Sequence, residues 1–482
     1  MPTTQWTEFR TRGRIVAVAA ATLITVLLGL LLAFAGRSTC GDGNVEIPCP
    51  TDPRGPEGQA VGDKFTFAHR PLGRDGSIAV RLAAMTGIIT YPPPNHNEIV
   101  PGLVQWAKAG VIVKDGTAPG SRYAALVMTG SHGVRMQHDY DHDVAGSASD
   151  PSTPRWLRLT RSGDLITGEE SADGERWTPV GTAALPGLPD TVQVGLLAAS
   201  PGDLTLVPSA LGASSAQERF TQTTAVFDHV TVDGSPTTGW TDTRVGESGA
   251  AEWEKNHHAP AVVESEGTVT VAGSGDIAPG STTGARPVEG TLAGLAFGLL
   301  VLIVVAARFT TLQNPKALLG RAAVVGAVSF ASGLVAAAVV IPLGSAVVDA
   351  NGGATLPTPF PVVLRVVLGV GVLAAATAVL ALAAAALLRS RWAAVLAVGV
   401  AVVVTYALAV LSLLPDEVTR WLLRVTPAAG FAVQQTVQEF PQVLGQYAPS
   451  TGYYPLPWWA GLLVLCGYAA AALGLAVRRL PR

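Results

Sequence analysis

The densest group of side chains capable of chemistry is a run of three Asp, two His and one Tyr at residues 138–143. Imidazole and carboxylate groups together are typical ligands of divalent metals. On a strand, alternate residues face one side, so His138 and His142 would share a face. They would lie about 13 Å apart at 3.3 Å per residue, too far for one ion. The sequence therefore favours a solvated strand face, and a calcium site built from the aspartates of a loop is the alternative.

Two other signatures of catalysis are missing from the sequence. Glycosidases commonly carry acids in the order Glu-x-Asp-x-x-Glu on one strand, whereas Glu169 and Glu170 are adjacent and would point to opposite faces. A nucleotide-binding P-loop needs a lysine directly after a glycine, and none of the five lysines follows one. We therefore expect no catalytic residue, no metal and no cofactor in this chain.

The composition predicts a membrane protein with one large soluble insert. Only 14% of the 482 residues are charged, against roughly 25% in an average soluble protein. Residues 37–289 hold 48 of the 67 charged side chains and sum to −12, while the remainder sums to +9. With so few lysines and no long basic block, binding to nucleic acid is not expected.

Six uncharged apolar runs are long enough, or nearly so, to cross a bilayer as helices, which needs about 20 residues. They are 15–36, 290–307, 322–348, 366–388, 392–414 and 457–477. The first run could also be a cleaved signal peptide, but it is longer than the usual ~7–15 apolar residues. The spans contain no Asp, Glu, Lys or His, which argues against an ion-coupled carrier.

The distribution of basic residues sets the orientation of these helices. With both termini in the cytoplasm, the segments 1–14, 308–321, 389–391 and 478–482 carry 11 Lys and Arg, against three in the short outer loops. The positive-inside rule therefore predicts a multi-pass plasma-membrane protein with residues 37–289 outside the cell. Residues 415–456 form an outer loop or helix, followed by Trp458 and Trp459 at the outer interface.

The outer block divides into three segments. Residues 37–60 are expected to form a Gly/Pro-rich stalk, in which Cys40 and Cys49 would form a disulfide on the oxidising side of the membrane. Residues 61–234 alternate apolar and polar side chains between turn signals, as in Trp156–Thr160, and predict an all-β sandwich. Residues 235–289, which include His257 and His258, are rich in Gly, Ser and Thr and predict a flexible linker.

Part of this outer block resembles a known family of sandwiches. The stretches from Trp156 to Leu159 and from Ser171 to Trp177, with Phe227–Val232, are similar to the concanavalin A/laminin-G-like jelly rolls. The resemblance covers roughly residues 61–234 and implies a jelly-roll fold. It does not imply one function, because such sandwiches bind sugars, bind proteins or catalyse reactions.

The membrane part resembles actinobacterial ABC-2 type permeases. The resemblance rests on Trp6–Arg12 before the first helix, on the segment from Trp421 to Gln435, and on Tyr453–Gly461 at the start of the last helix. It implies a permease subunit, most simply of an exporter, that forms a homodimer and pairs with a separate ABC ATP-binding subunit. ATP and Mg²⁺ would then be bound by that partner subunit.

The same resemblance implies where such a partner would dock. The coupling residues would lie in the interfacial segment and in the loop 308–321, and they are Trp6, Glu8, Phe9, Asn314 and Lys316. This loop is shorter than in many members of the family. A plain topogenic role for the N-terminal arginines is an alternative. For the whole chain, the alternative is a membrane-anchored receptor whose jelly roll binds carbohydrate or protein.

Overall fold

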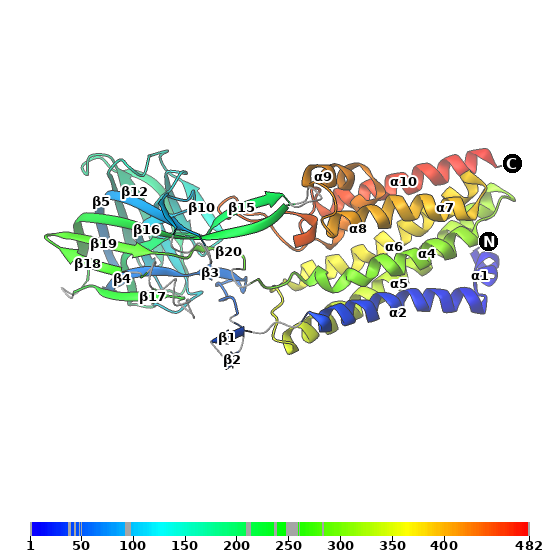
Figure 1. Ribbon diagram of the computed structural model, residues 1–482, viewed down its shortest axis with the longest axis horizontal. Coiled ribbons are helices and arrows are strands. Elements are labelled where there is room, and N and C mark those ends of the chain that lie inside the picture. The colour runs from blue at the N-terminus through cyan, green and yellow to red at the C-terminus, as the bar shows by residue number, and fades with distance from the viewer. Residues whose placement is uncertain are drawn as a thin grey trace.

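The computed structural model shows a β-sandwich joined to a bundle of helices (Figure 1). It describes residues 2–36, 40–42, 45–47, 49, 51–91, 98–208, 214–235, 239–246, 259, 261–281 and 284–480. Both chain termini lie at the end of the bundle that is farthest from the sandwich (Figure 1). We call this the terminal end of the bundle, and the opposite end the sandwich end.

Six helical segments of the described chain are long and apolar enough to cross a membrane. They are α2 (Arg12–Ala35), η1 with α4 (Val288–Gly294 and Leu295–Phe309), α5 (Pro315–Ala350), α6 (Phe360–Leu388), α7 to α8 (Arg391–Val398 and Thr405–Val410) and α10 (Trp458–Arg479). A π-helical segment, η2 (Gly399–Val404), joins α7 to α8. The expectation of six apolar helices beside one large all-β part is confirmed.

The helices differ from the predicted spans mainly at their charged ends. α5 begins at Pro315 rather than 322, because Asn314 caps it and its first turns carry Lys316 and Arg321. Its crossing with α6 depends on small residues. A Cβ at Gly333 would lie 2.9 Å from the Cβ of Ala374, so this close approach of the two backbones requires glycine.

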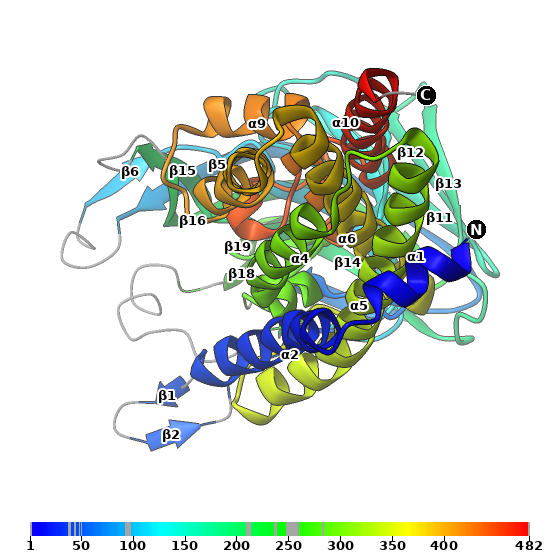
Figure 2. The same cartoon turned by 90° about the vertical axis from the view of Figure 1, so that its right-hand side faces the viewer.

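Short helices complete both ends of the bundle. At the terminal end, α1 (Pro2–Phe9) precedes α2, and Figure 2 shows it beside α2 and α5. At the sandwich end lie α9 (Asp416–Val425), η3 (Pro427–Gln434) and η4 (Pro449–Thr451), all within the predicted outer segment 415–456. The apolar core of the bundle includes Phe9 at the terminal end and Tyr454 at the sandwich end, so it reaches both ends of the bundle.

The sandwich consists of two antiparallel sheets. The first has the order β10 (His142–Ala145), β9 (Val134–His138), β8 (Tyr123–Thr129), β7 (Lys108–Lys114), β14 (Val192–Ala199), β4 (Phe65–Leu72), β17 (Thr241–Val245). The second has the order β13 (Thr178–Ala184), β12 (Leu165–Ser171), β11 (Arg155–Ser162), β5 (Asp75–Thr90), β16 (Ser214–Asp233), β19 (Thr268–Gly273), β18 (Ala261–Ser265). β6 (Ile99–Pro101) pairs with β5, and β15 (Asp203–Pro208) pairs with β16.

Side chains from the facing sheets form the main core of the sandwich. Val111 and Leu196 from the first sheet and Val80 and Leu157 from the second are all fully buried there. A smaller core covers the other face of the first sheet, where Phe67 packs with residues of the ribbon β3 (Val61–Asp63) and β20 (Ile277–Pro279). β7 is consequently buried on both faces.

The predicted linker over 235–289 is wrong for most of its described residues. β17 pairs with β4, β19 pairs with β16, and β20 pairs with β3, so this segment completes the sandwich. Val269 and Val271 of β19 enter the main core. The alternation of Thr and Val at 268–271 is short, and Gly, Ser and Thr around it give the composition of a linker. His257 and His258 lie outside the described residues.

The predicted stalk is also partly incorporated into the sandwich. Arg54 and Ala60 form a β-bridge. The side-chain amide of Gln59 donates to the carboxylate of Asp141 at 3.3 Å. Before this, β1 (Cys40–Asp42) pairs with β2 (Val45–Ile47) as a separate two-stranded ribbon. The sandwich therefore begins before residue 61 and ends after residue 234, beyond both predicted boundaries.

Among the described residues, contacts of Arg286 and Gln442 link the sandwich to the sandwich end of the bundle. Arg286, between β20 and η1, forms a parallel β-bridge with Thr355 of the loop between α5 and α6. The buried amide of Gln442, in the segment after η3, donates to the backbone carbonyl of Tyr140 at 3.5 Å. The turn at Tyr140, within the run singled out from the sequence, therefore faces the helices.

Candidate functional site

The short N-terminal helix α1 is anchored on the bundle by aromatic side chains. Phe9 is 1% exposed and its ring meets that of Phe309, the last residue of α4, edge-on at 5.1 Å between centroids. Trp6 stacks beside Phe9 at 6.3 Å and remains 44% exposed. One face of α1 is therefore fixed to α4, while the indole of Trp6 is accessible at the terminal end.

Arg321 of α5 holds the same assembly together with polar contacts. Its guanidinium donates to Glu8 Oε2 at 2.7 Å and to the backbone carbonyls of Phe309 and Thr310 at 3.1 and 3.0 Å. It also lies 5.0 Å from the centroid of the Phe309 ring. One side chain thus connects α1, the end of α4 and α5, so Arg321 belongs to the candidate site, although the sequence does not predict it.

The chain between α4 and α5 is reduced to five residues, 310–314. Asn314 Oδ1 accepts a hydrogen bond from the backbone amide of Ala317 at 2.8 Å, which is an N-cap contact. Lys316 in the first turn of α5 is exposed, and no hydrogen bond or ion pair to it occurs among the described residues. The connection between these helices is therefore a short turn followed by a capped helix start, where Lys316 is the cation without a partner among the described residues.

The five predicted coupling residues lie at the terminal end but have different roles. Phe9 is buried, Glu8 is paired with Arg321, and Asn314 caps α5, so these three build the site. Trp6 and Lys316 are exposed and available to another molecule. The segment 1–14 is also not one continuous helix, because Thr11, at the N-cap position of α2, has extended backbone angles.

The His/Asp run forms a hairpin rather than the single strand predicted for it. Asp139 and Tyr140 take positive φ angles of 46° and 72° in the turn between β9 and β10. This brings His138 opposite His142, with the two rings stacked at 4.2 Å between centroids. Burial, with a smaller contribution from His142, lowers the pKa of His138 to about 4. The separation of about 13 Å derived for an extended strand is therefore wrong.

The carboxylates of this hairpin form ion pairs or hydrogen bonds with neighbouring side chains. Asp143 pairs with Arg135, Asp139 lies 3.4 Å from Arg122, and Asp141 accepts from Gln59. Burial is the main reason that the pKa values of Asp139 and Asp141 are raised. Among the described residues, no group of three or more His, Cys, Asp or Glu side chains is placed to hold a metal ion.

The adjacent glutamates of β12 form separate ion pairs. Glu169 pairs with Arg158 at 2.7 Å and is partly exposed, while the buried Glu170 pairs with Arg155 at 2.8 Å and accepts from Ser147. They do not converge on a common point, as expected from their spacing. Each carboxylate neutralises an arginine of the same sheet.

The sandwich end of the bundle contains a buried acid. It lies one residue before the predicted span 290–307. Glu289 in η1 is 6% exposed and accepts hydrogen bonds from the amide and hydroxyl of Thr436. Nearby, Arg365 of α6 donates to the backbone carbonyl of Gln435. Glu289 therefore fixes the segment after η3 to the start of α4.

Cys49 is engaged in a disulfide. The side chain of Cys40 lies outside the described residues, so the Cys40–Cys49 pairing stays a prediction. Cys466 of α10 is a free thiol.

Comparison with known proteins gives no family for this chain. No family profile and no curated protein matches it. Weak matches among solved structures include a functionally unknown protein from Saccharomyces cerevisiae, with 14% identity, a TM-score of 0.23 and coverage of 42% of this chain and 93% of that one. The GH43 BlXynB protein from Bacillus licheniformis matches with 11% identity and a TM-score of 0.20, covering 33% of this chain and 28% of that one.

A third match is Scytalido-glutamic peptidase, with 10% identity and a TM-score of 0.28, covering 44% of this chain and 98% of that chain. Scores this low carry no argument about fold or activity. The functional interpretation of this chain consequently depends on its own geometry.

Proposed function

We propose that this chain is the membrane-spanning permease subunit of an ABC-2 type transporter, without a nucleotide site of its own. The observation that carries the proposal is the docking of α1 on the terminal end of the bundle. Phe9 is packed against Phe309, and Glu8 is paired with Arg321. An interfacial helix fixed in this way is suited to pass a push from outside the bundle to α4 and α5.

In this proposal the terminal end faces the cytoplasm and the sandwich lies outside the cell. The basic segments 1–14, 308–321 and 389–391 border the terminal end, as the positive-inside rule requires for a cytoplasmic face. The sandwich carries the acidic excess and lies beyond the opposite end (Figure 1). There it would receive, retain or sense cargo, with a jelly-roll topology as the proposed fold.

The proposed mechanism is relayed motion between two permease copies. An ATP-binding partner subunit, carrying ATP and Mg²⁺, contacts the exposed Trp6 and Lys316. When it closes, α1 moves, and the Phe9–Phe309 contact and the Arg321 hydrogen bonds transmit the movement to α4 and α5. These helices then rock relative to the second copy and open a path across the membrane.

Reconstitution with an ATP-binding subunit tests this proposal. The first candidate is any such subunit encoded next to this chain, co-expressed with it and purified in mild detergent. We expect a stable complex with equal numbers of the two subunits, whose ATP hydrolysis exceeds that of the ATP-binding subunit alone. The isolated chain should bind no ATP analogue. Stoichiometric binding of an ATP analogue by the chain alone would contradict the assignment.

Substitutions locate the coupling surface in that complex. Trp6→Ala combined with Lys316→Glu should abolish most of the stimulation of ATP hydrolysis while the amount of protein in the membrane is unchanged. Arg479→Glu is the matched control, since it alters one exposed cation of α10 at the same end of the bundle. Equal loss in both variants would mean that only overall charge matters, and unchanged stimulation in both would leave α1 with a topogenic role.

A further inference from the structure

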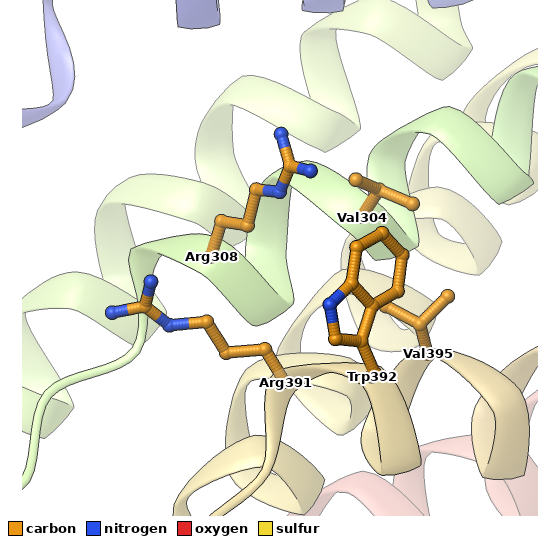
Figure 3. Close-up of a pocket in the computed structure, with 5 residues that line it drawn as sticks. All are labelled: Val304, Arg308, Arg391, Trp392 and Val395. Atoms are coloured by element: carbon orange, nitrogen blue, oxygen red, sulfur yellow. The ribbon is translucent and has the colours of Figure 1, made fainter.

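The terminal end also contains a pocket that the proposed coupling surface does not use. It lies between α4 and α7, has a volume of about 390 Å³, and is lined by Val304, Arg308, Arg391, Trp392 and Val395 (Figure 3). This size falls within the roughly 300–1,000 Å³ of small-ligand sites. Its lining combines two cations, one indole and two aliphatic side chains, with no acid among the five residues.

Neither arginine of this pocket has an anionic partner in the described chain. No hydrogen bond or ion pair of Arg308 or Arg391 occurs among the described residues. The guanidinium of Arg308 lies 5.6 Å from the centroid of the Trp392 ring, a cation–π contact that leaves its N–H groups free. Both guanidinium groups carry the same charge at one pocket, and an anion bound beside them would offset that charge.

The position of Arg391 strengthens the case for an anion. Arg391 is the first residue of α7, where the partial positive charge of the helix disfavours a cation. Arg14 of α2 is also close enough to be repelled by Arg391. The nearest acid in the described terminal end, Glu8, is already paired with Arg321. The local field is therefore positive and uncompensated.

The apolar side of the pocket distinguishes between possible anions. Val304 and Val395 are half-buried and line the pocket beside the guanidinium groups, while Trp392 is 70% exposed next to them. Tryptophan prefers the interface between head groups and acyl chains of a bilayer. A ligand that places a charge on the arginines and an aliphatic chain on the valines matches this lining.

We propose that this pocket binds the phosphodiester head group of an anionic membrane phospholipid. Arg308 and Arg391 would donate hydrogen bonds to the phosphate oxygens, for which planar guanidinium groups are well suited. The start of the acyl chain would lie on Val304 and Val395. The inference depends on the terminal end lying at a membrane surface, as in the proposed function, but it does not depend on an ATP-binding partner.

Titration of lipid into the purified full-length chain tests the proposal. The chain in a neutral detergent is mixed with dioleoylphosphatidylglycerol, and bound lipid is counted by native mass spectrometry. Dioleoylphosphatidylcholine serves as the zwitterionic lipid, and glycerol 3-phosphate and inorganic phosphate as free anions. We expect one phosphatidylglycerol site that phosphatidylcholine does not fill and that the free anions do not block at millimolar concentration. Competition by free phosphate would overturn the choice of a lipid.

Paired variants connect the binding to the pocket. Arg308→Gln with Arg391→Gln should weaken phosphatidylglycerol binding about 30-fold, because each basic residue near an anionic lipid contributes roughly a factor of five. Arg478→Gln with Arg479→Gln removes the same charge from the same end, and should leave this binding unchanged. Equal weakening in both double variants would overturn the site and leave only a diffuse attraction.

A third variant tests whether the space of the pocket is needed in addition to its two arginines. Val304→Phe keeps both arginines but fills the space between α4 and α7, so it should also abolish the phosphatidylglycerol site. Its fold is checked by its helical circular dichroism and its elution volume in detergent. Wild-type lipid binding by this variant would contradict the proposal even if the arginine variants were too unstable to measure.

The outcome is distinguishable from that of the proposed function. If the chain lacks an ATP-binding partner but spans a membrane, lipid binding persists and only the stimulation of ATP hydrolysis is absent. If the pocket is not a lipid site, the ATP hydrolysis of the complex is unaffected by its variants, while the Trp6 and Lys316 variants still act.

Discussion

In the β-sandwich, Lys114 is fully buried and donates to the equally buried carboxylate of Asp63 at 2.7 Å. At the terminal end of the bundle, Arg308 and Lys316 are exposed and have no anionic partner within the described chain. One region thus neutralises its buried charges internally, and the other presents charge outward. From this comparison we expect the sandwich to fold alone in water, and we propose that the terminal end meets other molecules.

The first prediction concerns the independence of the sandwich and has the largest expected effect. A fragment of residues 51–281 should fold as a soluble β-protein, while residues 61–234 alone should not. The shorter piece lacks β17, β19 and β20, and leaves the edges of β4 and β16 and part of the core uncovered. Circular dichroism and dispersion of amide signals in NMR spectra decide the matter, and equal folding of both fragments would contradict it.

The second prediction tests whether the internal charges of the sandwich are essential. Lys114→Met should lower the free energy of unfolding by about 3–5 kcal/mol, because Asp63 would remain buried without its cation. Arg74→Met removes the cation of an exposed pair with Asp190, and should cost no more than about 1 kcal/mol. Urea unfolding of the 51–281 fragment, followed by tryptophan fluorescence, measures both. Equal losses of unfolding free energy in the two variants would show that burial does not make the Lys114–Asp63 pair more important for stability than an exposed pair.

The third and smallest effect involves the hairpin that faces the bundle. His138 has a pKa lowered from 6.5 to about 4, mainly by burial. The unfolded chain therefore takes up a proton near pH 6.5 and the folded one only near pH 4, so protonation favours the unfolded state. Wild-type stability should fall relative to His138→Gln as the pH decreases from about 6.5 to about 4. Parallel stability curves for the two proteins would exclude this effect.

Much of the architecture follows from local sequence patterns. The apolar runs predict six helices because a helix in hydrocarbon must be apolar over about 20 residues, whatever it packs against. The strands around Trp156 follow from alternation of side chains. β19 was missed because its Thr-Val alternation is short, and because its identity as a strand depends on pairing with the distant β16.

The residues of the candidate site were only partly predictable. Trp6 and Phe9 are predicted because the segment before the first apolar run resembles that of ABC-2 type permeases. Arg321 was missed because its partner Glu8 is 313 residues away, and no spacing rule connects them. The stacking of His138 on His142 does not follow from the sequence, because the turn at Asp139 and Tyr140 contains no Gly and the run therefore has the pattern of one strand.

The most direct test of the account asks whether the two compared regions lie on opposite sides of a membrane. The free thiol is first removed by Cys466→Ala, and a single new cysteine is introduced as Glu175→Cys in the sandwich or Lys316→Cys at the terminal end. Intact cells are then treated with a membrane-impermeant maleimide. The account predicts labelling of position 175 in intact cells, and of position 316 only after the membrane is opened. Labelling of both positions in intact cells, or of position 316 alone, would contradict it.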